Sequence, residues 1–288
     1  MKIVIIGADG QLGTDLCRVI SKNEQIPLTV ADIDITNRRQ THEVIAKHKP
    51  DVVINTAAYH NVDKCEDEVE AAFKVNTYGV KYLAEACVQI NAALVHISTD
   101  YVFDGEKKTP YVETDPPNPQ SIYAISKLAG EKIVQYVCKK HFIIRSTGLY
   151  GVVGCLGKGG TNFVEGILKR ASEQPELKVV TDEIVSPTYT LDLAKQINEL
   201  IRTDNYGLYH CVSHGQCSWY DFAAKIFDLL GKKVVINKVT ADTFKTVANR
   251  PKYSVLENAN LKKLGLDMMR PWPEALRAYL VEKGYLTT

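Results

Sequence analysis

The sequence lacks several features that would assign it to a common class of protein. No apolar run approaches the roughly 18 residues that a membrane-spanning helix needs. The start, Met1 to Gly7, is interrupted by glycine too soon to be a signal peptide. The formal net charge is only +1, from 35 Lys and Arg against 34 Asp and Glu, so no strong field draws the chain to nucleic acid or to an anionic membrane. These absences predict a cytoplasmic protein whose partners are small molecules, and they leave its oligomeric state open, a homodimer included.

The cysteines also lack a recognisable pattern. There are seven, an odd number, and none forms a Cys-x-x-Cys pair, so reduced thiols are expected. The run His210-Cys211-x-x-His214-x-x-Cys217 has metal-binding residue types. However, His210 and Cys211 are adjacent and would point to opposite faces of a strand, and the spacing matches no closed zinc site. We therefore predict no metal ligands from this sequence.

The first 150 residues do contain a regular alternation of short β-rich runs and longer helical stretches. Strands are expected at residues 2–6, 28–31, 52–55, 94–98 and 142–145. Helices are expected at residues 12–21, 39–48, 68–90 and 121–140. Strands that are apolar on both faces and separated by helices indicate a parallel sheet covered on both sides. The predicted fold class is therefore α/β, with a Rossmann doubly wound parallel sheet.

The regular alternation of strands and helices ends after about Tyr150. A glycine-rich stretch at residues 151–160 precedes an expected helix at 162–174 and a strand at 177–180. Further helices are expected at residues 192–202, 220–230, 259–264 and 272–283. We expect residues 151–288 to form mostly a smaller C-terminal α/β substrate lobe, with about 178–205 returning to the first domain.

A glycine-rich turn stands at the first strand–helix junction. The run Gly7-Ala8-Asp9-Gly10-Gln11-Leu12-Gly13 has the glycine spacing of a dinucleotide site. Glycine permits the tight turn and a close approach of the backbone to a pyrophosphate, and the next helix offers free N–H groups. Many such turns serve only as turns, but the position favours a cofactor, so residues 1–150 are predicted to be an NAD(P)-binding domain. The predicted contacts here are Gly7, Gly10, Gln11, Leu12 and Gly13.

The choice between NADH and NADPH stays open in the sequence. Asp32, at the end of the second predicted strand, can accept hydrogen bonds from the adenosine ribose and would repel a 2′-phosphate. Arg38 and Arg39 can pair with that phosphate, or they are surface charges on a helix. Asp34 and Ile35 follow Asp32 almost at once.

Small residues end the third predicted strand. They leave room for a ligand in the crevice at the carboxyl ends of the strands, although packing alone would explain them equally well. The residues assigned to the cofactor at this edge are Asn55, Ala57, Ala58 and Tyr59.

Three residues are candidates for the chemistry. Tyr123 and Lys127 lie one helical turn apart and face the same side, and Thr99 ends the fourth predicted strand. A free phenol has a pKa of about 10. A nearby ammonium and the cofactor's positive charge would lower this pKa and prepare Tyr123 as a general acid–base. Lys127 can also hydrogen-bond the nicotinamide ribose, and Thr99 can hold the substrate oxygen. The cofactor must supply the hydride, since no side chain can.

Together these motifs resemble those of the extended short-chain dehydrogenase/reductases, and within them the dTDP-4-dehydrorhamnose reductase family. The resemblance runs over nearly the whole chain, and the run Ser-Thr-Asp-Tyr-Val-Phe-Asp-Gly at residues 98–105 is its most specific part. It is also carried by residues 7–13, 55–59, 62–66, 123–131, 186–188 and 208–210, and by Arg145, Trp219 and Arg250.

This resemblance implies reduction of the 4-keto group of dTDP-4-dehydro-6-deoxy-L-mannose to dTDP-L-rhamnose by NADPH or NADH. It makes Thr99, Tyr123 and Lys127 catalytic, with Tyr123 as the proton donor and both Tyr123 and Lys127 in contact with the cofactor. A divalent metal such as Mg²⁺ is implied by the resemblance only. The residues implied to contact the substrate are Thr99, Asp100, Tyr101, Phe103, Asn162, Phe163 and Arg250.

Other functions keep the same motifs. A reductase, epimerase or dehydratase for another nucleotide-deoxysugar is one alternative, because Asp100 stands where a dehydratase has its acid. A glycine-rich stretch at residues 155–160 could alter the choice of sugar. A non-catalytic, NADP-binding regulatory subunit like that of methionine adenosyltransferase is the other alternative, although the intact Thr99, Tyr123 and Lys127 favour catalysis.

Overall fold

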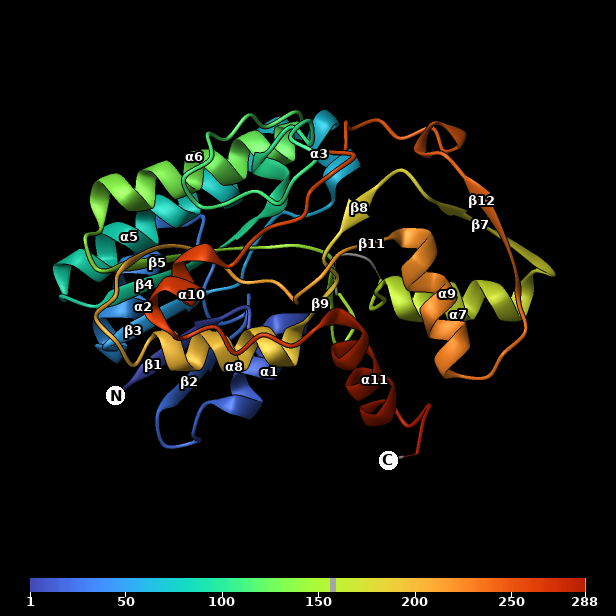
Figure 1. Ribbon diagram of the computed structural model, residues 1–288. Coiled ribbons are helices and arrows are strands. Elements are labelled where there is room, and N and C mark those ends of the chain that lie inside the picture. Colours follow the sequence, from blue (N-terminus) through green and yellow to red (C-terminus); the bar gives the residue numbers. More distant parts are fainter. Residues whose placement is uncertain (156–158, 288) are drawn as a thin grey trace.

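A six-stranded parallel sheet forms the centre of the larger part of the molecule (Figure 1). The computed structural model describes residues 1–155 and 159–287. The strand order is β10-β5-β4-β3-β1-β2, so the order reverses between β1 and β3, and a crevice forms at that point beyond the carboxyl ends of the strands. This topology confirms the predicted doubly wound sheet. The strands are β1 (Ile3–Ile6), β2 (Gln25–Leu28), β3 (Val52–Asn55), β4 (Ala93–Thr99), β5 (His141–Ser146) and β10 (Gly207–His210).

Helices cover both faces of this sheet because alternate side chains of each buried strand point to opposite sides. Ile3 and Ile5 of β1 pack with α1 (Gln11–Val19) and α8 (Thr190–Leu200) on one face. Val4 and Ile6 pack with α2 (Arg38–His48), α5 (Val80–Gln89) and α6 (Ile122–Val137) on the other face. The apolar runs in the sequence therefore reflect strands that are buried on both sides.

The second predicted strand is wrong by three residues, since β2 ends at Leu28. The next residues form a turn that the Asp32 carboxylate closes, accepting from the Thr29 amide at 2.8 Å and from the Thr29 hydroxyl at 2.9 Å. A side chain that satisfies nearby backbone groups in this way competes with strand pairing. Asp32 is therefore an exposed turn residue rather than the end of a strand.

The single helix predicted at residues 68–90 is also wrong. The chain forms α3 (Val62–Asp67), α4 (Val69–Phe73), a π-helical segment (Lys74–Gly79) and then α5. The π-helical turn buries the Asn76 amide, which bonds the Tyr59 backbone and the Ser126 hydroxyl. These tertiary contacts account for a widened turn that local propensity does not predict.

A smaller part of the molecule lies beside the sheet and contains α7, α9 and α11 (Figure 1). Its core is aromatic, with Tyr150 stacked on Tyr189 at a centroid distance of 5.7 Å and Tyr279 packed edge-on against both. Its helices are α7 (Phe163–Glu173), α9 (Trp219–Leu229) and α11 (Trp272–Glu282), and its strands are β6 (Leu149–Tyr150), β7 (Glu176–Val180), β8 (Ile184–Val185), β9 (Thr188–Tyr189), β11 (Cys217–Ser218) and β12 (Val235–Val239).

The chain crosses between the two parts more than once. Within the region predicted to return to the sheet, α8 packs on α1, whereas β7 pairs with β12 in the smaller part. Later, α10 (Ala259–Leu264) places Leu261 in the core beside β10. Among the described residues, short 3₁₀ turns are also present at Asp100–Val102 and Ala241–Thr243. No helix in the described part of the chain is long and apolar enough to cross a membrane.

A buried ion pair fixes α6 to the sheet. Arg145 of β5 donates to both carboxylate oxygens of Glu131 on α6, at 2.9 and 2.6 Å. Ser98 of β4 also donates to Glu131, and the Arg145 guanidinium lies over the Phe103 ring. Both charged side chains are almost fully buried, so removing one partner would leave the other charge unpaired away from water.

We expect Arg145→Met to lower the free energy of unfolding by about 3–5 kcal/mol, because it leaves the Glu131 carboxylate buried without its partner. Urea unfolding followed by circular dichroism measures the change. Arg202→Met is the matched control, since Arg202 pairs with Glu24 at the surface and its loss should cost much less. Equal losses in the two variants would contradict a special role for the buried pair.

Candidate active site

The glycines of the first turn are required by its geometry. Gly7 has a φ of +75°, a value that L side chains rarely adopt. A Cβ on Gly13 would lie 2.0 Å from the Gly7 carbonyl oxygen. Gly10 begins α1 and has no side chain to bond the first helical amides. The amino end of α1 therefore offers backbone N–H groups at the point where the strand order reverses, as a pyrophosphate site needs.

Two buried polar atoms beside this turn fit a dinucleotide. The Gln11 Oε1 and the Asn55 Nδ2 have no hydrogen-bond partner within the described residues, although each is shielded from water. An unmade hydrogen bond at a buried atom costs free energy, so such atoms call for an explanation. One is an acceptor and the other a donor, and both lie at the crevice between β1 and β3. A nucleotide cofactor in this crevice could bond both.

The loop after β3 is tied to the turn and to α6. The Thr56 hydroxyl donates to the Ile6 carbonyl at 2.8 Å. Asn76 accepts from the Tyr59 amide and donates to the Tyr59 carbonyl, both at 2.9 Å, and donates to Ser126 at 3.0 Å. Sequence reasoning missed Thr56, Asn76 and Ser126. The one indication in the sequence was Asn76, a polar residue inside the helical stretch predicted at residues 68–90.

The acids predicted to meet the ribose are engaged in local turns. Asp32 is bonded to Thr29, which lowers the pKa of the Asp32 carboxyl. Asp34 accepts from the Thr36 amide at 2.9 Å and the Thr36 hydroxyl at 2.7 Å. Ile35 is buried against Gly79. Contact of these residues with a cofactor stays a prediction.

The two arginines near this loop pair with surface acids. Arg38 donates to Glu85 at 3.1 Å, and Arg39 donates to Glu43 at 2.7 Å. Both arginine side chains are mostly exposed. The alternative interpretation of Arg38 and Arg39 as surface charges matches their place on α2.

Lys127 and Thr99 come together at the carboxyl end of β4. The Lys127 ammonium donates to the Ile97 carbonyl at 2.6 Å, and burial lowers the pKa of Lys127 to about 8. The Thr99 hydroxyl accepts from the Tyr101 amide and donates to Asp100 at 3.0 Å. The Ser121 side chain caps the start of α6, which carries both Tyr123 and Lys127. The structure therefore brings the three predicted catalytic residues together.

Burial raises the pKa of the Tyr123 phenol, and its hydrogen bond with the Thr99 side chain acts in the opposite direction. The lowering of this pKa by the Lys127 ammonium together with the charge of a bound cofactor stays a prediction. The Tyr101 ring packs edge-on against Tyr123 at a centroid distance of 6.0 Å. Tyr123 is therefore a neutral phenol that holds its proton, which is the form that a proton donor requires.

Asp100 and Phe103, two residues predicted to contact the substrate, are buried beneath the site. Asp100 is buried and accepts from the Thr147 hydroxyl at 2.7 Å, and burial raises the pKa of Asp100 to about 6. Phe103 stacks on Tyr111 at a centroid distance of 4.2 Å and is also buried. These contacts account for both residues as packing and support, and a direct substrate contact stays a prediction.

Asn162 and Phe163 begin α7. Asn162 caps the helix by accepting from the Glu165 amide at 3.1 Å, and it donates to the Gly151 carbonyl at 2.9 Å. Phe163 packs on Trp219 at a centroid distance of 4.6 Å. Residues 156–158 of the glycine-rich stretch lie outside the described residues.

Arg250 brings a positive charge from the C-terminal part of the chain to the site. Its Nη2 donates to Asp63 of α3 at 2.7 Å. The charges of Arg250 and Glu183 both act on the Tyr101 phenol, so the three groups lie near one another. Burial raises the pKa of Glu183, and a hydrogen bond from Trp219 opposes this. Sequence reasoning did not single out Asp63 or Glu183, because only the fold brings them to Arg250.

Within the described residues, no group of three or more His, Cys, Asp or Glu side chains is arranged to hold a metal ion such as Mg²⁺. Burial lowers the pKa of His210 to about 3, and its Nδ1 lies 3.1 Å from the Tyr111 carbonyl oxygen. Nearby, His214 lies 3.2 Å from Asp267.

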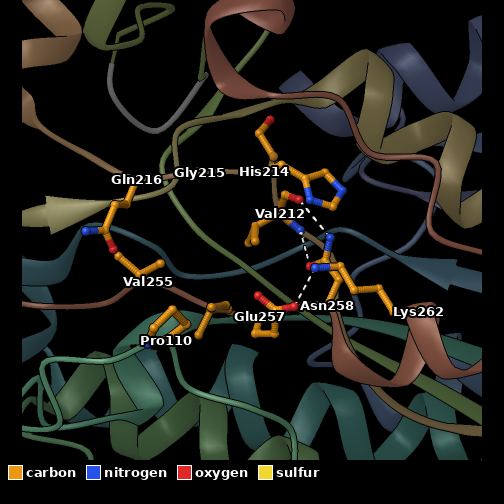
Figure 2. Close-up of a pocket in the computed structure, with 11 residues that line it drawn as sticks. Pro110, Val212, His214, Gly215, Gln216, Val255, Glu257, Asn258 and Lys262 are labelled. Carbon is orange, nitrogen blue, oxygen red and sulfur yellow. Dashed lines mark hydrogen bonds and ion pairs between the residues drawn. The ribbon is translucent and has the colours of Figure 1, made fainter.

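A separate hollow of about 130 Å³ lies between the loop after β10 and the segment before α10. Figure 2 shows the residues that line it. Asn258 bonds both backbone groups of Val212 there, and Glu257 pairs with Lys262 at its edge. None of the predicted site residues lines this hollow.

Comparison with known proteins assigns the fold and site to a family. Residues 1–284 match the family model described as the RmlD substrate binding domain. The Clostridium acetobutylicum dTDP-4-dehydrorhamnose reductase structure is 45% identical with a TM-score of 0.93, covering 98% of this chain and 99% of that one. This chain belongs to the dTDP-4-dehydrorhamnose reductase family.

Two further relatives are similar to this chain over nearly its whole length. The Bacillus anthracis dTDP-4-dehydrorhamnose reductase, solved in complex with NADP, is 40% identical with a TM-score of 0.93, covering 98% of this chain and all of that one. The Bacillus subtilis (strain 168) spore coat polysaccharide biosynthesis protein SpsK is 41% identical, covering 98% of each chain.

We expect Tyr123→Phe to lower kcat by at least about 100-fold, because the variant loses the proton of the phenol. The dissociation constant for NADPH, measured by fluorescence titration, should stay within about twofold, since ring and packing are kept. Tyr136→Phe on the same helix is the matched control, because Tyr136 is 92% exposed. An unchanged kcat in Tyr123→Phe would remove Tyr123 from the chemistry.

The pH dependence should follow Lys127. Its lowered pKa of about 8 means that the ammonium loses its proton as the pH rises through that value, before Tyr123, whose pKa is raised. The kcat of the wild type should therefore be level below about pH 8 and fall above it. Lys127→Met should have a lower rate and no such fall, and a wild-type rate that rises through pH 8 would contradict this account.

Proposed function

We propose that the protein reduces the 4-keto group of dTDP-4-dehydro-6-deoxy-L-mannose to dTDP-L-rhamnose. The observation that carries the proposal is the meeting of Thr99, Tyr123 and Lys127 at the edge of the sheet where the dinucleotide turn also lies. The family supports the same reaction, because two solved dTDP-4-dehydrorhamnose reductases are 45% and 40% identical to this chain over nearly its whole length.

Each catalytic side chain has a distinct task in this reaction. A bound NAD(P)H supplies the hydride for the carbon of the ketone. The Tyr123 phenol bonds the ketone oxygen and gives it a proton as negative charge develops. The Thr99 hydroxyl, whose one proton is donated to Asp100 in the structure, turns to donate to the same ketone oxygen. Lys127 uses one of its three N–H donors on the Ile97 carbonyl, which leaves donors for the nicotinamide ribose.

The larger part of the chain binds the cofactor in this proposal, and the smaller part binds most of the substrate. Residues 1–150, with α8 and β10, form the cofactor domain, and the rest of the second half forms most of the substrate lobe. Gln11 and Asn55 support this division, because each has a buried polar atom at the crevice with no hydrogen-bond partner in the described residues, and a bound cofactor could supply one. The cofactor contacts proposed are Gly7, Gly10, Gln11, Leu12, Gly13, Asp32, Asp34, Ile35, Asn55, Ala57, Ala58, Tyr59, Tyr123 and Lys127.

Arg250 is proposed to bind the diphosphate of the substrate, because a guanidinium bonds phosphate oxygens in pairs. Thr99 and Tyr101 would lie along the sugar, and Asp100, Phe103, Asn162 and Phe163 would shape the cavity around it. The cytoplasm is the proposed place of action, because the cysteines of the sequence are odd in number and form no Cys-x-x-Cys pair. A homodimer remains a prediction for sedimentation to test.

The direct test mixes the protein with dTDP-4-dehydro-6-deoxy-L-mannose and NADPH, and in parallel NADH, and identifies the sugar by NMR. We expect one cofactor oxidised for each dTDP-L-rhamnose formed, and the faster of the two reactions names the preferred cofactor. An epimerase or a dehydratase would return its cofactor unchanged. Binding of NADPH with no oxidation by this or any other nucleotide-ketosugar would favour a regulatory subunit instead.

A further inference from the structure

The short helix α3 joins the catalytic helix to the C-terminal part of the chain. Glu66 of α3 accepts a hydrogen bond from the Ile122 amide at 2.9 Å, at the start of α6. Three residues earlier on the same helix, Asp63 contacts the segment at residues 248–250. Figure 1 places α3 at the end of the sheet beside the start of α6, between the two parts of the molecule.

Asp63 uses both of its carboxylate oxygens on this one segment. Oδ1 accepts from the Ala248 amide at 3.0 Å, and Oδ2 accepts from the Arg250 Nη2 at 2.7 Å. Arg250 also donates from Nη1 to the Ala248 carbonyl at 3.2 Å. One carboxylate therefore fixes both the backbone of the segment and the guanidinium that it carries. The hydrogen bond from Arg250 lowers the pKa of the Asp63 carboxyl, so Asp63 is ionised at neutral pH.

Arg250 still has N–H donors for a ligand while it is hydrogen-bonded to Asp63. A guanidinium has five N–H donors, and within the described residues two of them make the bonds above. The charge of Arg250 also reaches the Tyr101 phenol, and the Tyr101 ring contacts Tyr123. The remaining N–H donors of Arg250 therefore lie near Tyr101 and Tyr123. Because α3 bonds both Arg250 and the start of α6, it fixes the position of these donors relative to Tyr123.

We infer that Asp63 is a positioning residue that orients Arg250 toward the anionic part of the substrate. The inference rests on the proposed function, in which Arg250 binds the diphosphate. Because α3 is bonded to the start of α6 through Glu66, Asp63 places this anion site relative to the helix that carries Tyr123. A competing role, in which Asp63 merely neutralises Arg250 and opposes the binding of anions, predicts the opposite change in affinity.

The test compares Asp63→Ala with Asp67→Ala. Asp67 lies on the same helix, is exposed, and its removal changes the charge by the same amount. We expect Asp63→Ala to raise the KM for the nucleotide-sugar about tenfold, as the loss of a charged hydrogen bond would. The kcat, the dissociation constant for NADPH and the melting temperature should stay close to those of Asp67→Ala. Asp63→Asn should behave like Asp63→Ala, because its amide cannot offer Arg250 a negative charge.

The cycle with Arg250→Ala separates positioning from general stability. If Asp63 acts through Arg250, the double variant should have the same KM as Arg250→Ala alone. The inference is overturned if Asp63→Ala lowers KM, leaves it unchanged, or raises it equally in both backgrounds.

Binding of dTDP, measured by calorimetry, keeps this test separate from the test of the reaction. We expect wild-type protein to bind dTDP about tenfold more tightly than Asp63→Ala does, whichever sugar is reduced. Equal affinities would overturn the inference while leaving the reaction intact. A missing turnover with this difference in dTDP affinity would instead reject only the proposed reaction.

Discussion

The active site depends on how α6 is fixed to the ends of β4 and β5. Two buried charged groups of this helix bond the sheet, Lys127 through the Ile97 carbonyl and Glu131 through Arg145. A rotation or a slide of α6 would leave these charges without partners in a site that excludes water, at a cost of several kcal/mol. The same contacts hold Tyr123 near Thr99, so the packing that stabilises α6 also positions the proposed proton donor.

The parts of the fold that follow from local pattern were predictable. Val4 and Ile5 point to opposite cores, and this alternation in short apolar runs predicts a sheet buried on both faces. The first glycine turn and the spacing of Tyr123 and Lys127 are also local, and they predict the cofactor edge and the catalytic helix. The turn closed by Asp32 was missed, because its side chain competes with the strand through bonds that hydrophobicity does not reveal.

Long-range contacts account for most of what sequence reasoning could not supply. The π-helical turn at Asn76 is held by hydrogen bonds to Tyr59 and to Ser126, which is 50 residues away in the sequence. Asp63 meets Arg250 across 187 residues, and no spacing rule connects them. The sequence pattern names the ammonium that neighbours Tyr123, whereas only the fold gives the burial that raises the pKa of the phenol. The proposed chemistry therefore lies at the sheet edge, and α3 connects this edge to Arg250 in the C-terminal part of the chain.

The central claim is that this site transfers a hydride from a nicotinamide to the keto carbon of a nucleotide-sugar. The most direct measurement uses NADPH that carries deuterium at both positions of nicotinamide C4, with the product examined by NMR and mass spectrometry. The account predicts dTDP-L-rhamnose with one deuterium at sugar C4, and oxidised cofactor in equal amount. A product without deuterium at that carbon, formed with no net oxidation of the cofactor, would contradict the assignment as a reductase.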